Sequence, residues 1–474
     1  MTPTSASSDG EVLIEHLAIV VRASDGGDGH PHRLLLIRHG DDWKLPRIAS
    51  ATDTSDAKVL TASVLNEAMS EQYGLSTSLL RCLFQRPSKD GDGIVRAYAL
   101  EHHGDADAIP EGAMWTNALE LDDLFLSHVD DRMALSAWAE SFTSSSESHA
   151  DWYAPGWWDE AMSWIDQALA EKGITREGPP EQVRSWTLSS VIRASTTSGG
   201  IYFKAVPQFM SHEGIGMSEM AKQYPTGASP LLSFDADKGW ILMPDFGGTR
   251  LVENPDIELW ERAVRTHAEM QIGQADRARS WLQMGVPDRS IRRMVDLIDP
   301  LITVSTQMLT GRAEGLSDDE IDALHGLSMR LKFMCAHLAD FKIPHSLVHG
   351  DLGGNIIVDD DGDLVFFDWT DACISHPFFD MATMASTVFD DNVFKSDESV
   401  AIRIRDAYLQ PWTKYEPMDR LIQAYDASRP LGALHQTMSY LWILTNIAED
   451  TRWEVEIGLP TWIRRLLRLC GQSQ

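Results

Sequence analysis

The feature that most constrains the fold is the stretch of residues 347–382, where short apolar runs alternate with clusters of Gly and Asp. Ile356 to Val358 and Leu364 to Phe367 are two such apolar runs, and Asp359 to Gly362 between them has the composition of a tight turn. The segment therefore predicts a β-hairpin, preceded by a strand that ends at Leu347-Val348.

Polar residues stand at the open end of this predicted hairpin. His349-Gly350-Asp351 predicts a tight loop, Asn355 comes just before the first hairpin strand, and Asp368 follows the second. Because the two ends of a hairpin lie side by side, Asp351, Asn355 and Asp368 are predicted to meet.

Phosphoryl transfer from ATP needs this set of groups. One carboxylate orients the attacking hydroxyl and accepts its proton, and oxygen ligands, typically Asp plus Asn, hold the Mg²⁺ ions that bridge the phosphates. The alternative interpretation is an Asp-rich turn that only solvates a hairpin. It would require two turns, two strands and three functional residues to coincide by chance.

The same stretch resembles the signature of aminoglycoside phosphotransferases and their choline, homoserine and fructosamine kinase relatives. The motifs that carry the resemblance are HGDL, the N that follows it, FDW.DA and HP..DMA. The resemblance extends over roughly residues 152–470. It implies a protein-kinase-like, two-lobed phosphotransferase fold that uses ATP and Mg²⁺. The roles that it implies are Asp351 as catalytic base, Asp368 and Asn355 as magnesium ligands, and His349 and Asp380 as supports of the catalytic loop.

The sequence departs from the family pattern in this loop. The family usually has five residues from the Asp to the Asn, whereas HGDLGGN places Asn355 four after Asp351 and lacks the second His. A shift of one residue moves a side chain by about 3 Å, comparable to a metal–ligand distance. Gly353 and Gly354 offer the conformational freedom to absorb it.

The predicted nucleotide lobe comes earlier in the chain. Gly200 to Val206 alternates like a strand, and Lys204 near its end suits contact with ATP phosphates. A lysine on a strand is otherwise an ordinary solvated charge. The resemblance implies an acidic partner for Lys204 on the next helix, for which Glu213 is preferred over Glu219.

Two further segments of this lobe are expected to contact the nucleotide. The turn Thr187-Leu188-Ser189-Ser190 would cover the phosphates with backbone N–H groups, with Ser189 and Ser190 nearest to them. Residues 239–248 resemble the hinge between lobes, which implies that backbone groups from Met243 to Asp245 bind adenine. An ordinary buried strand ending in a turn is the alternative for this second segment.

The first part of the chain is expected to be a separate, smaller α+β domain. Strand-like runs cover residues 12–21, 33–37 and 94–100, and helical spacing covers 58–73, with Gly74 at a C-cap position. WKLP and the helix ending EQYGL resemble a Nudix domain, whose helix binds Mg²⁺ through several glutamates. Here only Glu71 stands at such a position, which favours a non-catalytic role; an unrelated α+β domain and a Nudix-type hydrolase are the alternatives.

These boundaries predict a disordered tail at 1–10, the Nudix-like domain at 11–140 and a Ser-rich linker at 141–151. The kinase-like domain follows at 152–474, with its N-lobe at about 152–243 and its C-lobe at about 247–474. In it a helix is predicted at 157–170, strands at 183–206 and 231–243, and mainly helix from Glu258 onward.

The net charge of −31 argues against a nucleic-acid backbone as partner. It is compatible with a cationic acceptor, but an acidic soluble surface is the favoured explanation. We find no signal peptide, no membrane-spanning run and no paired cysteines, so the cytoplasm is the expected location. The oligomeric state does not follow from the sequence.

The leading hypothesis is therefore an enzyme that moves the γ-phosphate of Mg-ATP to a hydroxyl of a small molecule. The candidates for acceptor contacts are acidic residues and tryptophans in the later part of the chain: Asp371, Glu449, Asp450, Trp412, Trp442, Trp453 and Trp462. The rival hypothesis is a pseudokinase that binds nucleotide without turnover, because of the shortened loop.

Overall fold

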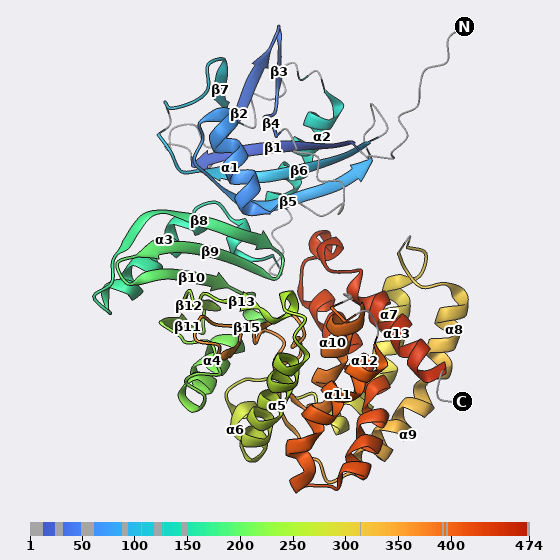
Figure 1. The fold of residues 1–474 in the computed structure, drawn as a ribbon. Coiled ribbons are helices and arrows are strands. Elements are labelled where there is room, and N and C mark those ends of the chain that lie inside the picture. Colours follow the sequence, from blue (N-terminus) through green and yellow to red (C-terminus); the bar gives the residue numbers. More distant parts are fainter. Residues whose placement is uncertain are drawn as a thin grey trace, which may run out of the picture. The chain divides into compact units, whose positions relative to one another are not determined.

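The computed structural model describes residues 13–23, 32–48, 61–87, 93–105, 107–117, 126, 128–143, 149–312, 314–390, 393–394 and 397–471 (Figure 1). The chain divides into two compact units, residues 1–205 and 206–474. Both contain sheets and helices, so the α+β class is confirmed. The division falls inside the predicted N-lobe, and the first unit therefore holds the N-terminal sheet together with the first strands of that lobe.

The first unit opens with a seven-stranded mixed sheet in the order β3-β2-β1-β6-β5, with β4 paired to β1 and β7 to β2. β1 and β6 run parallel, and the other recorded pairs are antiparallel. The strands are β1 (Leu13–Ala23), β2 (His32–His39), β3 (Asp42–Lys44), β4 (Arg47–Ile48), β5 (Thr77–Pro87), β6 (Gly93–His102) and β7 (Ala113–Thr116).

The middle of β1 is buried on both faces. Leu17, Ile19 and Val21 contribute to one apolar core, and the alternating Ala18 and Val20 are equally buried. Two helices belong to this part, α1 (Ala62–Tyr73) and α2 (Val129–Thr143) (Figure 1). A strand enclosed on both sides reads as a continuous apolar run, which is why the sequence predicts it well.

Helix α1 confirms the prediction of a helix that ends before Gly74. The Thr61 hydroxyl accepts from the Val64 N–H and caps the first turn, and Gly74 adopts φ 68° at the C-terminus. Residues 58–60 of the predicted helix lie outside the described residues, as do the predicted tail at 1–10 and part of the predicted linker. Within that linker, α2 extends to Thr143.

The rest of the first unit is a helix and an antiparallel three-stranded meander. Helix α3 (Trp157–Ala170) has the predicted bounds and buries its apolar face, including Met162 and Ile165. Strands β8 (Arg176–Trp186), β9 (Ser189–Thr196) and β10 (Gly199–Ala205) pair in sequence. Phe203 of β10 lies 6.0 Å, centroid to centroid, from Trp157, so α3 packs on the meander.

The second unit is mainly helical, as predicted (Figure 1). Its strands are short: β11 (Ser233–Asp235), β12 (Trp240–Pro244), β13 (Thr249–Arg250), β14 (Ser346–Val348), β15 (Ile356–Val358), β16 (Leu364–Phe366) and β17 (Cys373–Ser375). Its helices are α4 (His212–Gln223), α5 (Ile257–Gln274), α6 (Ala278–Gln283), α7 (Ile291–Leu309), α8 (Asp318–Gly326), α9 (Ser328–Ala339), α10 (Asp380–Ala385), α11 (Glu398–Leu409), α12 (Met418–Asn446) and α13 (Gly458–Gly471).

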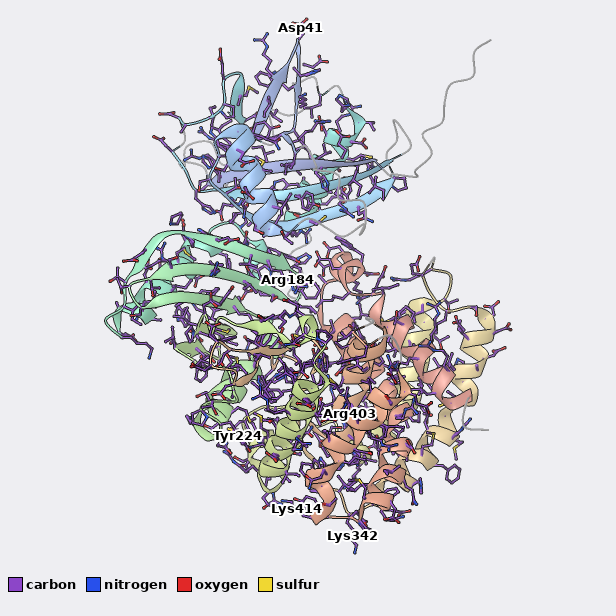
Figure 2. All side chains as sticks on the ribbon, viewed as in Figure 1. Asp41, Arg184, Tyr224, Lys342, Arg403 and Lys414 are labelled. Atoms are coloured by element: carbon purple, nitrogen blue, oxygen red, sulfur yellow. The ribbon has the colours of Figure 1, made fainter. Side chains whose placement is uncertain are left out.

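Ion pairs connect some of these helices at the surface. Arg403 of α11, labelled in Figure 2, lies 2.6 Å from Glu261 of α5. Such exposed pairs contribute at most about 1 kcal/mol each, so the buried apolar faces hold the bundle together. Among the described residues, no helix is long and apolar enough to cross a membrane.

Candidate active site

The predicted hairpin forms in the second unit, where β15 and β16 pair antiparallel with Ile356 opposite Phe366. The Asp359 carboxylate accepts from the backbone N–H groups of Asp361 and Asp363, at 3.1 and 2.7 Å, and so closes the turn. At the open end the Phe367 N–H donates to the Asn355 carbonyl at 3.2 Å. The hairpin therefore fixes Asn355 beside the chain that continues into Asp368, as predicted.

The His349-Gly350-Asp351 loop leaves β14 in a conformation that requires glycine. Gly350 has φ 85°, and a Cβ there would lie 2.4 Å from the backbone oxygen of Asp371. Any side chain would therefore clash with backbone as well as strain the main chain. The Gln436 amide of α12 donates to the Gly350 carbonyl at 2.6 Å, so the loop is held from the helical side too.

Asp380, the first residue of α10, holds the start of this loop. Its carboxylate accepts the backbone N–H groups of His349 and Gly350 at 2.9 and 2.8 Å. His267 Nε2 and Gln271 Nε2 of α5 lie 2.7 and 2.9 Å from the same carboxylate. The side chain is fully buried, so this fourfold network gives it the partners that a buried charge needs.

The network also determines the charge of Asp380. Burial alone would favour the neutral acid, but the hydrogen bond and charge of His267 and the donors of the loop outweigh it. The pKa of Asp380 therefore lies below its ordinary value. An ionised Asp380 that binds the loop backbone fits the supporting role that the family resemblance implies.

His349 has a structural place within the same loop. Its Nε2 lies 2.9 Å from the Phe367 carbonyl, and its Nδ1 accepts from the Asp351 N–H at 3.4 Å. A carbonyl can only accept, so Nε2 carries the proton. Burial lowers the pKa of His349 to about 4, and its ring packs 4.5 Å from Trp369 between centroids. The neutral His349 side chain therefore connects the catalytic loop to the segment that follows β16.

The shortened loop brings Asn355 to Asp351 in spite of its length. The Asn355 amide nitrogen donates to the Asp351 carbonyl at 2.7 Å and lies 3.2 Å from its carboxylate. A Cβ on Gly353 would lie 2.0 Å from the Thr387 hydroxyl. The second glycine position of HGDLGGN is thus where the chain passes tightly over Thr387, and only glycine fits that path.

Asp368 has an unusual backbone conformation. With φ 62° it is the only non-glycine residue with positive φ in the described part of the chain. Such a conformation costs free energy and persists where the surroundings impose it, commonly at functional sites. Its Oδ1 lies 2.5 Å from the Thr370 hydroxyl, which is also 3.1 Å from Oε2 of the buried Glu213. Thr370 therefore connects Glu213 to Asp368.

The carboxylates of the site are crowded. Burial raises the pKa of Asp351 to about 7, and the charges of Asp371 and Asp368 act in the same direction. By surface area Asp351 is exposed, although protein atoms surround it densely, and water will moderate the shift. Asp380 adds a third negative charge that acts in the same direction. Such a cluster of acids is suited to a cation.

The predicted nucleotide contacts are distributed over both units. Lys204 is buried in β10 of the first unit, opposite Val191 of β9. Glu213 is fully buried near the start of α4 in the second unit. The disfavoured Glu219 lies instead at the surface, where it pairs with Lys222 and Arg277 at 2.6 and 3.0 Å. The choice of Glu213 over Glu219 therefore agrees with their burial.

The predicted phosphate loop and hinge fall on well-defined elements. The turn itself consists of Thr187 and Leu188, and Ser189 and Ser190 begin β9 as buried residues. The Ser189 hydroxyl accepts from Trp186 Nε1 at 2.9 Å. Met243 is buried in β12, and Asp245 follows this strand and accepts from the Gly247 N–H at 3.1 Å.

The acceptor candidates separate into core and site residues. Trp412 is fully buried and packs on Phe378, so it belongs to the core. Glu449 and Asp450 are exposed. Asp371 acts electrostatically on Asp351, and both carboxylates, after burial, raise the pKa of Tyr440 of α12. Asp371 and Tyr440 therefore belong to the electrostatic surroundings of Asp351.

Several residues of the site were missed by sequence analysis. They are His267, Gln271, Thr370, Thr383, Gln436 and Tyr440. A signal existed for the first two, because His267 and Gln271 are polar residues at i and i+4 on a helical face otherwise buried as Ala263, Val264 and Ala268. The others had no comparable signal, since their partners are distant in sequence.

The comparisons with known proteins agree with this site. Residues 220–421 match the model of the phosphotransferase enzyme family, and this region includes Asp351, Asn355, Asp368 and Asp380. The match supports a phosphotransferase enzyme acting on a small molecule. No curated protein sequence matches the chain significantly.

The solved structures to which this chain is similar include kinases and phosphotransferases. A Plasmodium vivax ethanolamine kinase is 13% identical, with 74% of this chain and 97% of that one covered, at a TM-score of 0.47. The choline kinase LicA from Streptococcus pneumoniae is 13% identical over 66% and 100%, at 0.44. A macrolide 2′-phosphotransferase type I is 14% identical over 62% and 95%, at 0.43.

Proposed function

We propose that this protein is an ATP-dependent kinase that phosphorylates a hydroxyl group of a small molecule. The observation that carries the proposal is the contact of Asn355 with Asp351 on a loop held by the buried Asp380. The Phe367 N–H, one residue before Asp368, binds the Asn355 carbonyl. The match of residues 220–421 to the phosphotransferase enzyme family supports it independently.

In this proposal Asp351 accepts the proton of the acceptor hydroxyl as its oxygen attacks the γ-phosphorus. The bond between that phosphorus and the bridging oxygen of ATP breaks, and ADP leaves. Asn355 keeps Asp351 in place through its amide N–H. Most of the acceleration would come from positioning and charge neutralisation, because the transferred group needs little covalent assistance.

The residues present fit Mg²⁺. The described residues contain no ready group of three or more His, Cys, Asp or Glu side chains for a metal, yet Mg²⁺ in kinases takes only one or two protein carboxylates plus phosphate oxygens. Asp368 and the Asn355 amide oxygen would hold it, since the Asn355 nitrogen is already engaged with Asp351. The ion would neutralise phosphate charge, and the mutual repulsion of the carboxylates that act on Asp351 favours such a cation.

The nucleotide contacts remain proposals that follow the family resemblance. Lys204, fixed by Glu213, would bind the phosphates, and the turn before Ser189 and Ser190 would cover them. Met243 and Asp245 would bind adenine through the backbone. Lys204 is buried, which favours a binding role over that of a solvated surface charge.

We propose further that the acceptor carries a cationic group close to its hydroxyl. Asp371 acts electrostatically on Asp351, and both act on Tyr440; a carboxylate with an aromatic ring is a common binding site for amines. The rival, a nucleotide-binding protein without turnover, is favoured by the missing loop residue. The contact of Asn355 with Asp351 argues against it, because the shortened loop still assembles the pair.

For the N-terminal domain we propose a non-catalytic, Nudix-like role. Support comes from the mixed sheet with its parallel β1–β6 pair and from helix α1 ending at Gly74. Glu71 and Glu67 of α1 are exposed, and one carboxylate at a canonical position cannot supply the ligands that Mg²⁺ prefers.

The test is calorimetric titration of ATP into the full chain with and without Mg²⁺, followed by an acceptor screen with amino alcohols and amino sugars. We expect Mg²⁺ to tighten ATP binding and Asp368→Ala to abolish that effect. ATP binding that ignores Mg²⁺, with no turnover on any acceptor, would favour the pseudokinase.

A further inference from the structure

A cleft of about 430 Å³ lies between α7 and α9 in the second unit. Side chains of both helices and of the segment 341–345 line it, together with His376, which follows β17. Helix α9 leaves room there because it presents small side chains, Cys335, Ala336 and Ala339, that share one face. The volume is within the range that small-molecule sites occupy.

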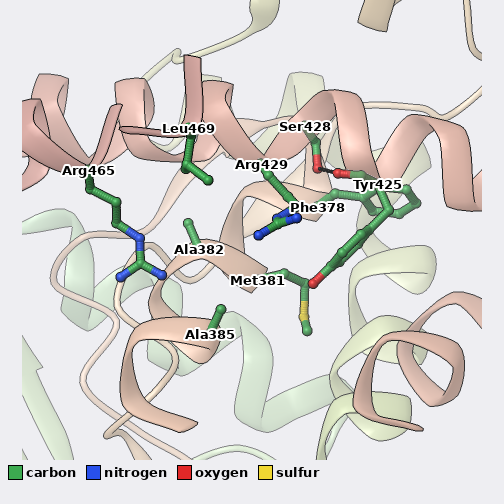
Figure 3. A pocket seen from close by; sticks show the side chains of 9 residues that line it. All are labelled: Phe378, Met381, Ala382, Ala385, Tyr425, Ser428, Arg429, Arg465 and Leu469. Atoms are coloured by element: carbon green, nitrogen blue, oxygen red, sulfur yellow. Dashed lines mark hydrogen bonds between the residues drawn. The ribbon is translucent and has the colours of Figure 1, made fainter. Parts of the chain in front are cut away.

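A second cavity, shown in Figure 3, is much smaller. It measures about 40 Å³ and lies among α10, α12 and α13, with Phe378 and Met381 in its lining. That volume holds about three water molecules. Phe378 also contacts the His376 ring, 5.0 Å away between centroids. Of these two cavities, only the cleft between α7 and α9 has room for an organic molecule.

The lining of the cleft is mainly apolar. Its two basic side chains define no preference for charge, because Lys332 pairs with Asp299 at 2.5 Å and Arg292 is exposed at the surface. The apolar lining residues are Ile291, Val295, Leu338, Phe341 and Ile343. An apolar body gains free energy when it leaves water for such surroundings.

Two histidines add hydrogen-bonding groups to this lining. His345 directly precedes β14 and His376 directly follows β17. Because Ser346 pairs with Ser375, the two histidines occupy opposite positions at the same end of the ladder. Burial lowers the pKa of His376 to about 3 and also lowers the pKa of His345. Both imidazoles are therefore neutral, and each has one N–H donor.

The partners of the two rings show where these protons lie. The Phe378 N–H donates to His376 Nδ1 at 3.3 Å, so the proton of His376 is on Nε2. His376 is 1% exposed, and its Nε2 has no hydrogen-bond partner among the described residues. The Ile291 N–H donates to His345 Nε2 at 3.4 Å, which leaves the His345 proton on Nδ1. A buried N–H without an acceptor costs free energy, and a ligand oxygen would remove that cost.

We propose that this cleft binds a small molecule with an apolar body and a carbonyl or carboxylate oxygen, and that this oxygen accepts the Nε2–H of His376. The apolar body packs on α7 and α9. Since Nε2 is itself buried, binding includes a side-chain shift that uncovers it. The ligand tightens the segment from His376 to Asp380, the residue that accepts the His349 and Gly350 N–H groups. No chemistry occurs in the cleft, so the proposal does not depend on phosphoryl transfer.

The experiment titrates phenylbutanoate, phenylbutanamide and phenylbutylamine separately into the full chain. Calorimetry reports the affinity, and NMR of the histidine side chains reports the Nε2–H of His376. We expect the acid and the amide to bind and to shift this resonance. The amine should bind about tenfold more weakly or not at all, because its ammonium group only donates. Binding of the acid alone would identify a carboxylate ligand and binding of both a carbonyl oxygen; each supports the site.

Variants decide where the probe binds. His376→Asn removes the Nε2–H but keeps an acceptor for the Phe378 N–H, because asparagine caps helix starts well. It should weaken binding of the acid by about three- to tenfold, and His325→Asn, an exposed histidine of α8, is the control. Ala336→Phe fills the cleft from its exposed side and should abolish binding. Ala323→Phe, at an exposed alanine of α8, should leave it unchanged.

The proposal is overturned if neither the acid nor the amide binds, or if the amine binds as tightly as they do. It is also overturned if Ala336→Phe or His376→Asn binds the acid with the affinity of the original chain. Should His376→Asn fail to fold, Ala336→Phe and the series of three probes still decide, because Ala336 is exposed on a helix surface and accepts a larger side chain.

Discussion

Carboxylates in the two units have different surroundings. In the first unit Asp131 lies 3.0 Å from Arg47, which also pairs with Glu15, and Asp130 pairs with Arg86. In the second unit three further aspartates, Asp371, Asp368 and Asp380, act on Asp351 and favour its neutral form. Acids paired with arginine hold elements together, whereas acids that crowd one another are suited to binding a cation.

The largest effect that tests this contrast is on turnover. Asp351→Ala and Asp368→Ala should each lower kcat by at least about 10³-fold, because one removes the proposed base and the other the proposed metal ligand. Steady-state kinetics with the acceptor found in the screen measures it. Asp361→Ala, an exposed aspartate in the β15–β16 turn, should keep full activity; an unaffected Asp368→Ala enzyme would refute the site.

The next prediction compares the losses of stability and of kcat that follow from replacing Asp380 and Asp131. Asp380→Ala leaves the N–H groups of His349 and Gly350 without their acceptor and should cost about 3–5 kcal/mol of unfolding free energy, together with most of kcat. Asp131→Ala leaves Arg47 with Glu15, so about 1–3 kcal/mol is expected and kcat is unchanged. Urea denaturation and kinetics on both variants measure this. Equal losses of activity would remove the distinction between the two regions.

The pH dependence follows from the raised pKa of Asp351, about 7. The ionised form is the base, so kcat/KM should fall as pH drops through this value, and Mg²⁺ should shift the transition lower because a cation favours the carboxylate. The native state holds this proton more tightly than the unfolded chain. Stability should therefore fall as pH rises from about 4 to 7.

Asp351→Asn separates these effects. It lacks the titrating group, so its melting temperature should lose that part of the pH dependence, while Asp380, whose pKa is lowered, keeps its stabilising contribution until the pH falls below about 4. Melting curves from pH 4 to 8, with and without Mg²⁺, give both slopes. An identical slope in the two proteins would mean that Asp351 titrates normally.

Much of the second unit could be predicted because its decisive contacts are local. The β15–β16 hairpin, its acidic turn and the placing of Asn355 and Asp368 follow from turn chemistry within a few residues. The capping box of Ser317 and Glu320 at the start of α8 is another local contact of this kind. The contacts of Asp380 with His267 and Gln271 were not, since 113 and 109 residues separate the partners.

The conformation of Asp368 could not have been predicted either. A positive φ at an aspartate arises from tertiary surroundings, here including Thr370 and, through it, Glu213, which is 157 residues away from Thr370 in the chain. Sequence shows which groups are available for chemistry, and the long-range hydrogen bonds determine how precisely they are held.

The smallest expected effect lies at the edge of β5 in the first unit. Gln182 of β8 accepts from the Leu79 N–H at 2.6 Å and donates to the Leu79 carbonyl at 2.9 Å, so its amide pairs with β5 much as another strand would. Ser185 donates to the Leu80 carbonyl at 3.0 Å beside it. Both β5 and β8 stand at the ends of their sheets, and this contact covers an otherwise unpaired edge.

Gln182→Ala should therefore cost about 1–3 kcal/mol, because the Leu79 backbone groups stay buried without partners. Gln72→Ala, an exposed glutamine of α1, is the control and should change stability by less than about 0.5 kcal/mol. Limited proteolysis and thermal denaturation measure the loss, and kcat should not change. A fall in kcat without loss of stability would show that the N-terminal sheet acts on phosphoryl transfer through β8.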